Sequence, residues 1–180
     1  GEKRRIPVAY EDFPTELIEA FLAAEDDRFF EHPGVDYQGL LRAAYSLALT
    51  GEKTQGGSTI TMQVARNFFL SNEKTYLRKI NEIFLSLEIE NTLSKEEILT
   101  LYLNKIFLGH RSYGVGAAAE VYYGKTLDEL TLGQMAMIAG LPKAPSTTNP
   151  ITAPQRALDR RNYVLSRMLD VGFISQSEYQ

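Results

Sequence analysis

The chain has 180 residues, of which 44% are hydrophobic, with no cysteine and two histidines. This length can bury one sizeable core and is most simply a single domain. The composition excludes disulfides and thiolate chemistry and argues against a zinc site of the usual kind. The net charge of −4 is unevenly distributed, because residues 37–81 carry +4 and the rest of the chain carries −8. A basic middle in an acidic protein favours an anionic ligand there, whereas a nucleic-acid reader would more often be basic throughout.

The first predicted element is a helix that begins near Pro14 and ends at His32-Pro33-Gly34. Its apolar side chains recur at helical spacing, and they are Leu17, Ile18, Phe21, Leu22 and Phe29. Glu25 falls on the same face, so burial and neighbouring acids are expected to raise the pKa of its carboxyl towards that of a useful proton acceptor. The alternative is a partly buried Glu25 paired with Arg28 or a nearby arginine.

The next predicted elements lie in the basic stretch, residues 37–81. A helix is predicted over 37–49, and the Gly-rich stretch 50–57 is expected to be a mobile loop. Two glycines ahead of a hydroxyl cluster and a helix start resemble an anion-binding turn, although the spacing of a P-loop is absent. The helix predicted over 75–91 has Arg78 and Glu82 on one face, where periodicity alone predicts a solvated ion pair. Its opposite, apolar stripe consists of Leu77, Ile80, Ile83, Phe84 and Leu87.

The last part of the chain is also predicted to be helical. A capping box at 94–97 opens a buried helix that runs through Phe107, and a short helix is expected over 117–123. Thr131 caps another helix, and the proline-rich segment 142–154 is an extended loop. The helix over 154–171 has a basic face that is predicted to be solvated. Its arginines are Arg156, Arg160, Arg161 and Arg167.

Both ends indicate a piece of a longer protein. The chain opens without an initiator methionine or an apolar leader, and a capping box at 175–178 announces a helix just before the last residue. No apolar run approaches the ~18 residues of a membrane span, so we expect any anchor to lie outside these residues.

Five sequence blocks carry a resemblance to a known family. In chain order they are Glu25-Asp26-x-x-Phe29-x-x-His32-x-Gly34, then Gln55-Gly56-Gly57-Ser58-Thr59-Ile60-Thr61-x-Gln63, Arg78-Lys79-x-x-Glu82, Glu97-Ile98-Leu99-x-x-Tyr102-Leu103-Asn104, and Arg160-x-x-x-Val164-Leu165-x-x-Met168. With these blocks the chain resembles the glycosyltransferase domain of class A penicillin-binding proteins. Two positions depart from the family pattern: Met62 stands where a Gln is usual, which leaves its role in the donor groove open, and Gln134 stands where a Glu is common.

The resemblance implies an all-α, lysozyme-like fold with a large globular lobe and a small mobile membrane-proximal lobe. The whole stretch 1–180 would be a single glycosyltransferase domain, with the small lobe at roughly 46–74. A transmembrane anchor and a transpeptidase domain are expected outside it.

The implied reaction is the polymerisation of lipid II into glycan strands at the outer face of the bacterial cytoplasmic membrane. Glu25 resembles the general base. Glu82 resembles the second essential acid, which either orients the cations or holds a divalent cation, Mg or Mn, at the diphosphate. No organic cofactor and no nucleic acid is expected, and the phosphoglycolipid inhibitor moenomycin would share the donor groove. The residues expected to bind the substrate are Arg42, Gln55, Ser58, Gln63, Arg66, Lys74, Arg78 and Lys79.

Two alternatives stay open. A muramidase or lytic transglycosylase shares the fold, but a hydrolase of neutral glycosidic bonds has no pyrophosphate for a basic cluster to neutralise. A non-catalytic module that binds lipid pyrophosphates would keep the bases and need neither acid.

A membrane-facing patch is also predicted, since the lipid tail of the substrate stays in the bilayer. Leu47, Leu49, Phe68 and Phe69 or their neighbours should form an exposed apolar surface, and it should be rimmed by Lys53 and Arg66. The alternative is that these side chains close an ordinary core.

Overall fold

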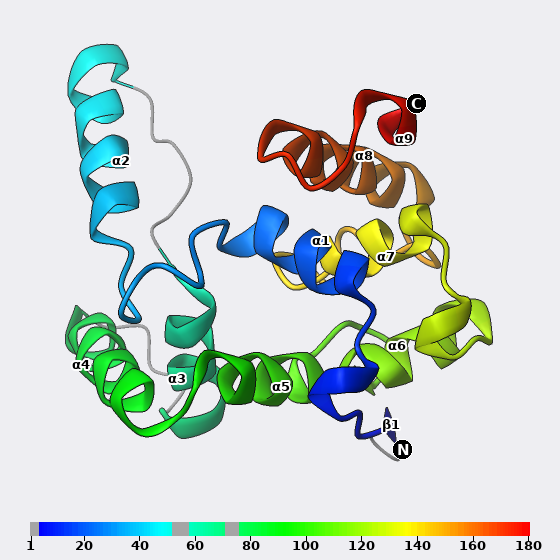
Figure 1. Cartoon of the computed structure of the whole chain (residues 1–180), viewed down its shortest axis with the longest axis horizontal. Helices are drawn as coiled ribbons and strands as arrows, with labels where there is room; N and C mark the ends of the chain where they lie inside the picture. The colour runs from blue at the N-terminus through cyan, green and yellow to red at the C-terminus, as the bar shows by residue number, and fades with distance from the viewer. Residues whose placement is uncertain (1–3, 52–57, 71–75) are drawn as a thin grey trace. The chain divides into compact units, whose positions relative to one another are not determined.

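The computed structural model describes residues 4–51, 58–70 and 76–180. The chain divides into two compact units, one formed by the residues up to Asp27 together with 99–180 and the other by 28–98. The predicted all-α class is confirmed (Figure 1). Among the described residues the only strands are β1 (Arg4–Arg5) and β2 (Ser112–Tyr113), which pair in parallel with Arg4 opposite Ser112.

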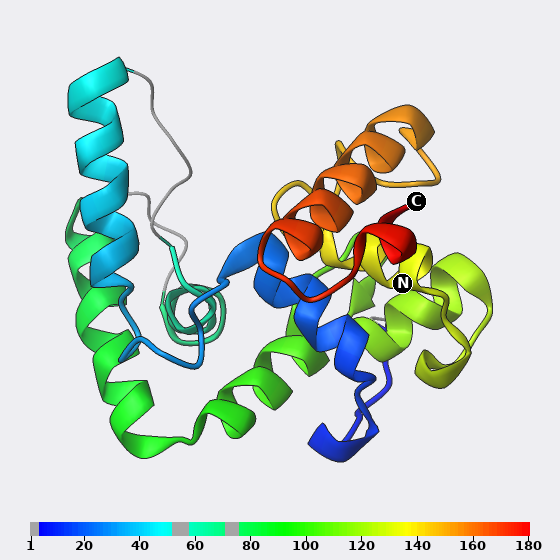
Figure 2. The same cartoon turned by 45° about the horizontal axis from the view of Figure 1, so that its top comes forward.

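The first unit is built around α1, which packs against α7 and α8, and these two also pack on each other (Figure 2). The ring of Phe21 on α1 meets Tyr102 edge to face, with centroids 6.0 Å apart, and both side chains are fully buried. The elements of this unit are η1 (Tyr10–Asp12), α1 (Thr15–Glu25), the end of α5 (Lys95–Lys105), α6 (Val115–Tyr123), η2 (Leu127–Glu129), α7 (Leu132–Ala139), α8 (Pro154–Asp170) and α9 (Gln176–Tyr179).

Asn104 fixes the segment that leads into α1. Its Oδ1 accepts a hydrogen bond from the Val8 amide and its Nδ2 donates one to the Val8 carbonyl, each at 2.8 Å. Gly114, with φ at +91°, lies against the Asn104 carbonyl, and a Cβ there would collide with it. The Asn104 of the fourth block is thus explained by its structural contacts.

α1 ends at Glu25, and its predicted continuation to His32 is wrong. Asp26 leaves the helical conformation with φ at −166°, while its amide still donates to the Leu22 carbonyl at 2.8 Å. Consecutive acids at a helix C-terminus face the negative end of the helix dipole, and Asp is a weak helix former. Glu25 is therefore the last helical residue, at the point where the chain turns away.

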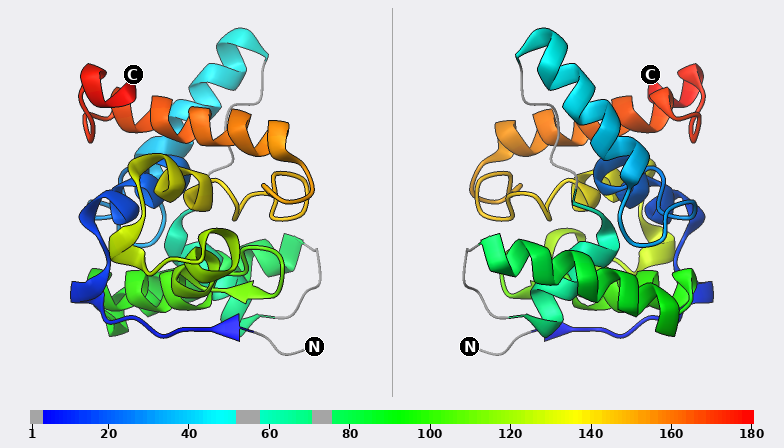
Figure 3. Two further views of the ribbon diagram at one scale, coloured as in Figure 1. Left: turned by 90° about the vertical axis from the view of Figure 1, so that its right-hand side faces the viewer. Right: turned by 90° about the vertical axis from the view of Figure 1, so that its left-hand side faces the viewer.

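The second unit contains α2 (Tyr37–Thr50), α3 (Ile60–Phe69), α4 (Tyr76–Thr92) and the start of α5. α3 packs along α4. α2 extends away from both of them (Figures 1 and 3), and none of its residues is buried. Its ends have local causes: Asp36 accepts a hydrogen bond from the Gly39 amide at 3.0 Å, and Gly51 adopts φ of +71°.

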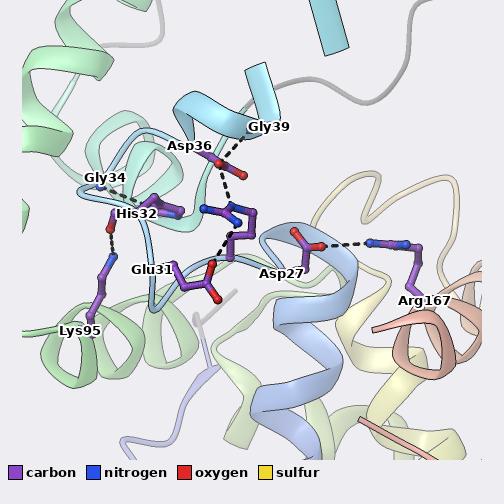
Figure 4. A network of polar contacts seen from close by, with 9 residues as sticks. Asp27, Glu31, His32, Gly34, Asp36, Gly39, Lys95 and Arg167 are labelled. Carbon is purple, nitrogen blue, oxygen red and sulfur yellow. Dashed lines mark hydrogen bonds and ion pairs between the residues drawn. The ribbon is translucent and has the colours of Figure 1, made fainter. Parts of the chain in front are cut away.

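The loop between α1 and α2 is held by several of the residues in the first block (Figure 4). Gly34 adopts a φ of +111°. Its amide donates a hydrogen bond to His32 Nδ1 at 3.0 Å, and its carbonyl accepts one from Thr59 Oγ1 at 2.6 Å. Lys95 Nζ donates to the His32 carbonyl at 2.6 Å and lies 4.4 Å from the centre of the Phe29 ring. Phe29, His32 and Gly34 therefore fix the backbone of this unit.

α4 buries two polar side chains together with Ile89, and it exposes part of its apolar stripe. Glu82 and Ser86 are fully buried, whereas Leu77, Ile80 and Phe84 are exposed, Phe84 to 67%. The solvated ion pair that periodicity predicted at Glu82 is therefore wrong. Periodicity locates the two faces of a helix but does not determine which of them packs on a neighbour.

The other predicted helices are confirmed, with small shifts at their ends. The capping boxes at Ser94, Thr131 and Ser175 are all present. α5 ends at Lys105, short of the predicted Phe107, and α6 begins at Val115. The loop predicted over 50–57 lies mostly outside the described residues.

Candidate functional site

The centre of the candidate site in the second unit is the carboxylate of Glu82. Its side chain is 0% exposed, and three cations surround it. Arg78 Nε lies 3.4 Å from Oε2, Lys79 Nζ lies 3.6 Å from Oε1, and Arg66 Nη1 lies 3.9 Å from Oε1. Arg78, Lys79 and Glu82 belong to α4 and Arg66 to α3, so the packing of these two helices assembles the group.

The contacts between Glu82 and these three cations are long. Neither buried oxygen of Glu82 has a hydrogen-bond partner among the described residues, and every separation exceeds an ordinary N–H···O distance. Among the described residues of this group, three positive charges face one negative charge. A group of this kind suits an anionic ligand such as a diphosphate.

Ser58 joins this group from the segment that precedes α3. Its Oγ accepts a hydrogen bond from Lys79 Nζ at 2.9 Å. Thr59, the N-cap of α3, accepts from the Met62 amide at 3.1 Å. The start of α3 therefore lies beside the cations, which places a helix N-terminus and its amide groups at the same location.

The remaining predicted binding residues fall in different places. Gln63 is buried on α3, and Arg42 is exposed on α2, where its guanidinium makes no ion pair with another described residue. Gln55 and Lys74 lie outside the described residues. The structure thus brings together Ser58, Arg66, Arg78, Lys79 and Glu82 and does not join Arg42 to them.

The two departures from the family pattern have structural roles. Met62 is 2% exposed and belongs to the core of the second unit. Gln134 completes the capping box of α7 with Thr131, and its Oε1 also accepts from Lys125 Nζ at 3.1 Å.

Glu25 lies in the first unit and is paired with an arginine distant in sequence. Arg160 Nη2 on α8 is 3.8 Å from Glu25 Oε1, and both side chains are largely buried. Arg28, the neighbour that the sequence suggested, pairs instead with Glu31 and with Asp36, at 3.0 and 3.2 Å.

The basic face of α8 was expected to be solvated, and for two of its arginines this is wrong. Arg160 pairs with Glu25, and Arg167 Nη2 lies 3.3 Å from Asp27 Oδ2 (Figure 4). The two arginines are seven residues apart, so they share one helix face. That spacing, together with the acidic run at 25–27, is the signal that sequence reasoning missed.

The described residues do not suit a divalent cation at Glu82. No group of three or more His, Cys, Asp or Glu side chains in the described part of the chain is arranged to hold a metal ion. The oxygens of Glu82 already face three cations, which would repel a further positive charge. Hard cations prefer several carboxylate or carbonyl ligands, and this environment offers one carboxylate.

The helical fold places a buried carboxylate and three cations beside a helix N-terminus, an arrangement that suits an anionic ligand. The family model described as Transglycosylase matches residues 1–169. The chain belongs to the transglycosylase family, and its reaction class is glycosyl transfer.

Similar proteins are found in several bacteria. The chain is 62% identical over 179 residues to penicillin-binding protein 1A of Escherichia coli and 58% identical over 180 residues to that of Pseudomonas aeruginosa. These alignments cover 99% and 100% of this chain but 21% and 22% of the relatives, so the chain spans about a fifth of their length. The crystal structure of penicillin-binding protein 1A from Haemophilus influenzae matches with a TM-score of 0.58 at 41% identity, covering 99% of this chain and 17% of that one. This match supports the predicted lysozyme-like fold.

Replacing Glu82 tests whether it holds the cations together. Glu82→Gln removes the one negative charge that the described residues place among these three cations, so we expect Tm to fall by roughly 5–10 °C in a thermal unfolding experiment. Added pyrophosphate should raise Tm more in the variant than in the wild type, because it supplies the missing negative charge. Glu88→Gln, an exposed change on the same helix, serves as the control. An unchanged Tm in Glu82→Gln would show that the carboxylate does not organise this group.

Proposed function

We propose that the chain is a peptidoglycan glycosyltransferase that polymerises lipid II, in the way that its resemblance to class A penicillin-binding proteins implies. The observation that carries the proposal is the Glu82 group, in which three cations surround a single buried carboxylate. Lipid II carries its disaccharide on a diphosphate, which is the leaving group of the transfer. A leaving group that gains negative charge in the transition state is stabilised by cations already held in place.

Glu25 acts as the general base in this reaction. It takes the proton from the 4-hydroxyl of the acceptor GlcNAc as that oxygen attacks the anomeric carbon of the donor MurNAc. A new carbon–oxygen bond forms, the bond to the diphosphate breaks, and the configuration inverts. The undecaprenyl pyrophosphate leaves with the bonding electrons, and the proton on Glu25 later passes to water.

The cations of the second unit bind the diphosphate and offset the charge that develops on it. Lys79 and Arg78 come from one turn of α4 and Arg66 from α3, so the diphosphate would contact two helices at once. Glu82 keeps these side chains close together in the absence of substrate, so little reorganisation is needed when the substrate binds. A divalent cation, where one takes part, would be carried mainly by the diphosphate oxygens, since Glu82 already faces three cations.

The alternative functions are less favoured. A hydrolase of neutral glycosidic bonds needs an acidic glutamate but has no use for excess positive charge at a separate position. A module that only binds lipid pyrophosphates would not need Glu25, whose charge is balanced by a largely buried arginine.

The first test uses labelled lipid II with wild type and Glu25→Gln. Glutamine keeps the shape of the side chain but cannot take up a proton, so turnover should fall by roughly 10²–10⁴-fold. Polymer formation is read on a gel, where a hydrolase would instead release fragments. Glu16→Gln at the other end of α1 should leave turnover unchanged. Wild-type turnover in Glu25→Gln would remove Glu25 from the mechanism.

A second test uses moenomycin, the phosphoglycolipid inhibitor of the family, which resembles the donor. Lys79→Ala should weaken its binding in titration calorimetry by about tenfold or more, because a charge-assisted contact to phosphate is lost. Lys105→Ala, an exposed lysine at the end of α5, is the control. If Lys79 served only the fold, the variant would lose some stability and keep the affinity of the wild type.

We also propose that the second unit docks on the outer face of the cytoplasmic membrane through α2 and α4. The structure describes no helix that is long and apolar enough to cross a bilayer. Leu47, Leu49 and Phe69 are exposed, as predicted, while Phe68 is partly buried and Lys53 lies outside the described residues. The exposed apolar surface also extends beyond these residues. On α2 and α4 it includes Tyr37, Leu40, Leu41, Tyr45, Leu77, Ile80 and Phe84.

The helical arrangement of these residues suits a lipid surface. On α2 the apolar residues cover one broad side of the helix, and Leu41 is exposed to 70%. α2 contains no acidic residue, and Arg42 lies at the edge of its apolar side. A basic side chain there would face anionic headgroups. This role suits Arg42 better than a place among the cations around Glu82.

Vesicle co-sedimentation tests this docking. In the intact protein, Leu41→Ser with Tyr45→Ser, or Phe84→Ser alone, should lower the partition coefficient onto phosphatidylglycerol vesicles by roughly tenfold or more, since each removes apolar area that is buried on binding. Ala43→Ser, on the other side of α2, adds the same hydroxyl and should have no effect. Binding that is insensitive to all of these changes would refute docking through α2 and α4 and leave the catalytic assignment intact.

A further inference from the structure

Arg160 is held in place by contacts from three sides within the first unit. Its Nε donates a hydrogen bond to the Gly140 carbonyl at 3.3 Å, and its guanidinium carbon lies 4.6 Å from the centre of the Tyr163 ring. Its Nη2 lies 3.8 Å from Glu25 Oε1. A Cβ on Gly140 would come within 2.7 Å of Arg160 Cγ, so the arginine passes α7 at a position where only glycine leaves room.

Glu25 is a residue that needs such a partner. It is the last residue of α1, where the helix dipole opposes a negative charge. Asp26, which is buried, and Asp27 follow directly and add negative charge. α1 packs against α7, which has no ionisable side chain, and against α8, which brings Arg160 and Arg167. Arg160 is the cation that these helices direct at the Glu25 carboxylate.

The distance between the two groups indicates how Arg160 acts. At 3.8 Å the contact is longer than a hydrogen bond, so Arg160 acts on Glu25 through charge without taking up its oxygens. A close bidentate pair would bind the carboxylate oxygens that a general base uses to take up a proton. The neighbouring Arg167–Asp27 pair is closer, at 3.3 Å, and about a third exposed on both sides. An exposed pair of that kind contributes little beyond a local tie.

We propose that Arg160 is a positioning residue for Glu25: held by Gly140 and Tyr163, it keeps the carboxylate ionised and in a fixed orientation before the acceptor arrives. This inference rests on the proposed role of Glu25 as the base. Without the cation Glu25 would hold its proton more tightly, so activity should be lost at a higher pH as the solution is acidified. The orientation of the Glu25 carboxylate would also become less fixed, so turnover should fall more than substrate affinity.

The experiment compares Arg160→Gln, Arg160→Lys, Arg167→Gln and Glu25→Gln in the intact protein, with labelled lipid II as substrate. For Arg160→Gln we expect kcat to fall about 10- to 100-fold with KM changed less than about threefold. The acid limb of its pH profile should move up by about one unit. Arg160→Lys keeps the charge and loses the planar contacts, so the acid limb should stay near its wild-type position while kcat remains low. Arg167→Gln should match the wild type in kcat and in pH profile.

Every other result would contradict one specific claim. A raised KM with unchanged kcat in Arg160→Gln would make Arg160 a substrate-binding residue and overturn the proposal. Losses that are equal in Arg160→Gln and Arg167→Gln, with no shift of the pH profile, would show a purely structural tie and also overturn it. Circular dichroism will show whether Arg160→Gln folds. If it does not, the pH profile of Arg160→Lys tests the proposal instead, because a shifted acid limb in that variant contradicts it. Turnover retained in Glu25→Gln would instead refute the proposed role of Glu25 as the base, on which this inference rests.

Discussion

The second unit depends on the burial of one carboxylate among three cations. Removing Glu82 from water is costly, and only the surrounding positive charges offset that cost. The arrangement sets the orientation of α4, since the face that carries Glu82 must lie against α3, where Arg66 is found. Ser86 is buried on the same face, whereas the apolar side chains of Leu77, Ile80 and Phe84 are exposed. Charge pairing, rather than the burial of apolar side chains, determines which face of α4 packs against α3.

The first unit follows a more usual rule, in which an apolar core supports a charged pair at its edge. Phe21 and Tyr102 are fully buried, and α1 ends at its last packed turn with Glu25. The arginine that balances this carboxylate is fixed by a backbone carbonyl and an aromatic ring. The two units thus treat their acids differently. Three cations surround Glu82, whereas Glu25 pairs with Arg160 across α1 and α8.

Local signals in the sequence predicted most of the helices. The capping boxes and the hydrophobic periods located α4, α5, α7 and α8 to within a few residues, because both signals depend on neighbours in the chain. Ser58 and Lys79, which come from two different family blocks, lie beside each other and Lys79 lies beside Glu82.

The predictions that were wrong concerned contacts between residues distant in sequence. The inward face of α4 follows from Arg66, and the pairing of Glu25 follows from Arg160 on α8. For Arg66 no local pattern contains that information, and for Arg160 the signal is divided between the acidic run at 25–27 and the spacing of arginines on α8. The end of α1 was missed for another reason, since its apolar period continues to Phe29 while the run of acids stops the helix.

Because no residue of α2 is buried, the stability of this helix depends on what covers its apolar side. The helix has 14 residues, none of them buried, and an isolated helix of about that length is marginal in water. Its caps, Asp36 and Gly51, are the main local terms that favour it. Ordering of α2 and coverage of its apolar side are therefore one coupled equilibrium, in which any surface that covers the helix also completes its formation. The apparent affinity of such a surface would be reduced by the free energy needed to order α2, and the helix content of the protein would rise as the surface is occupied.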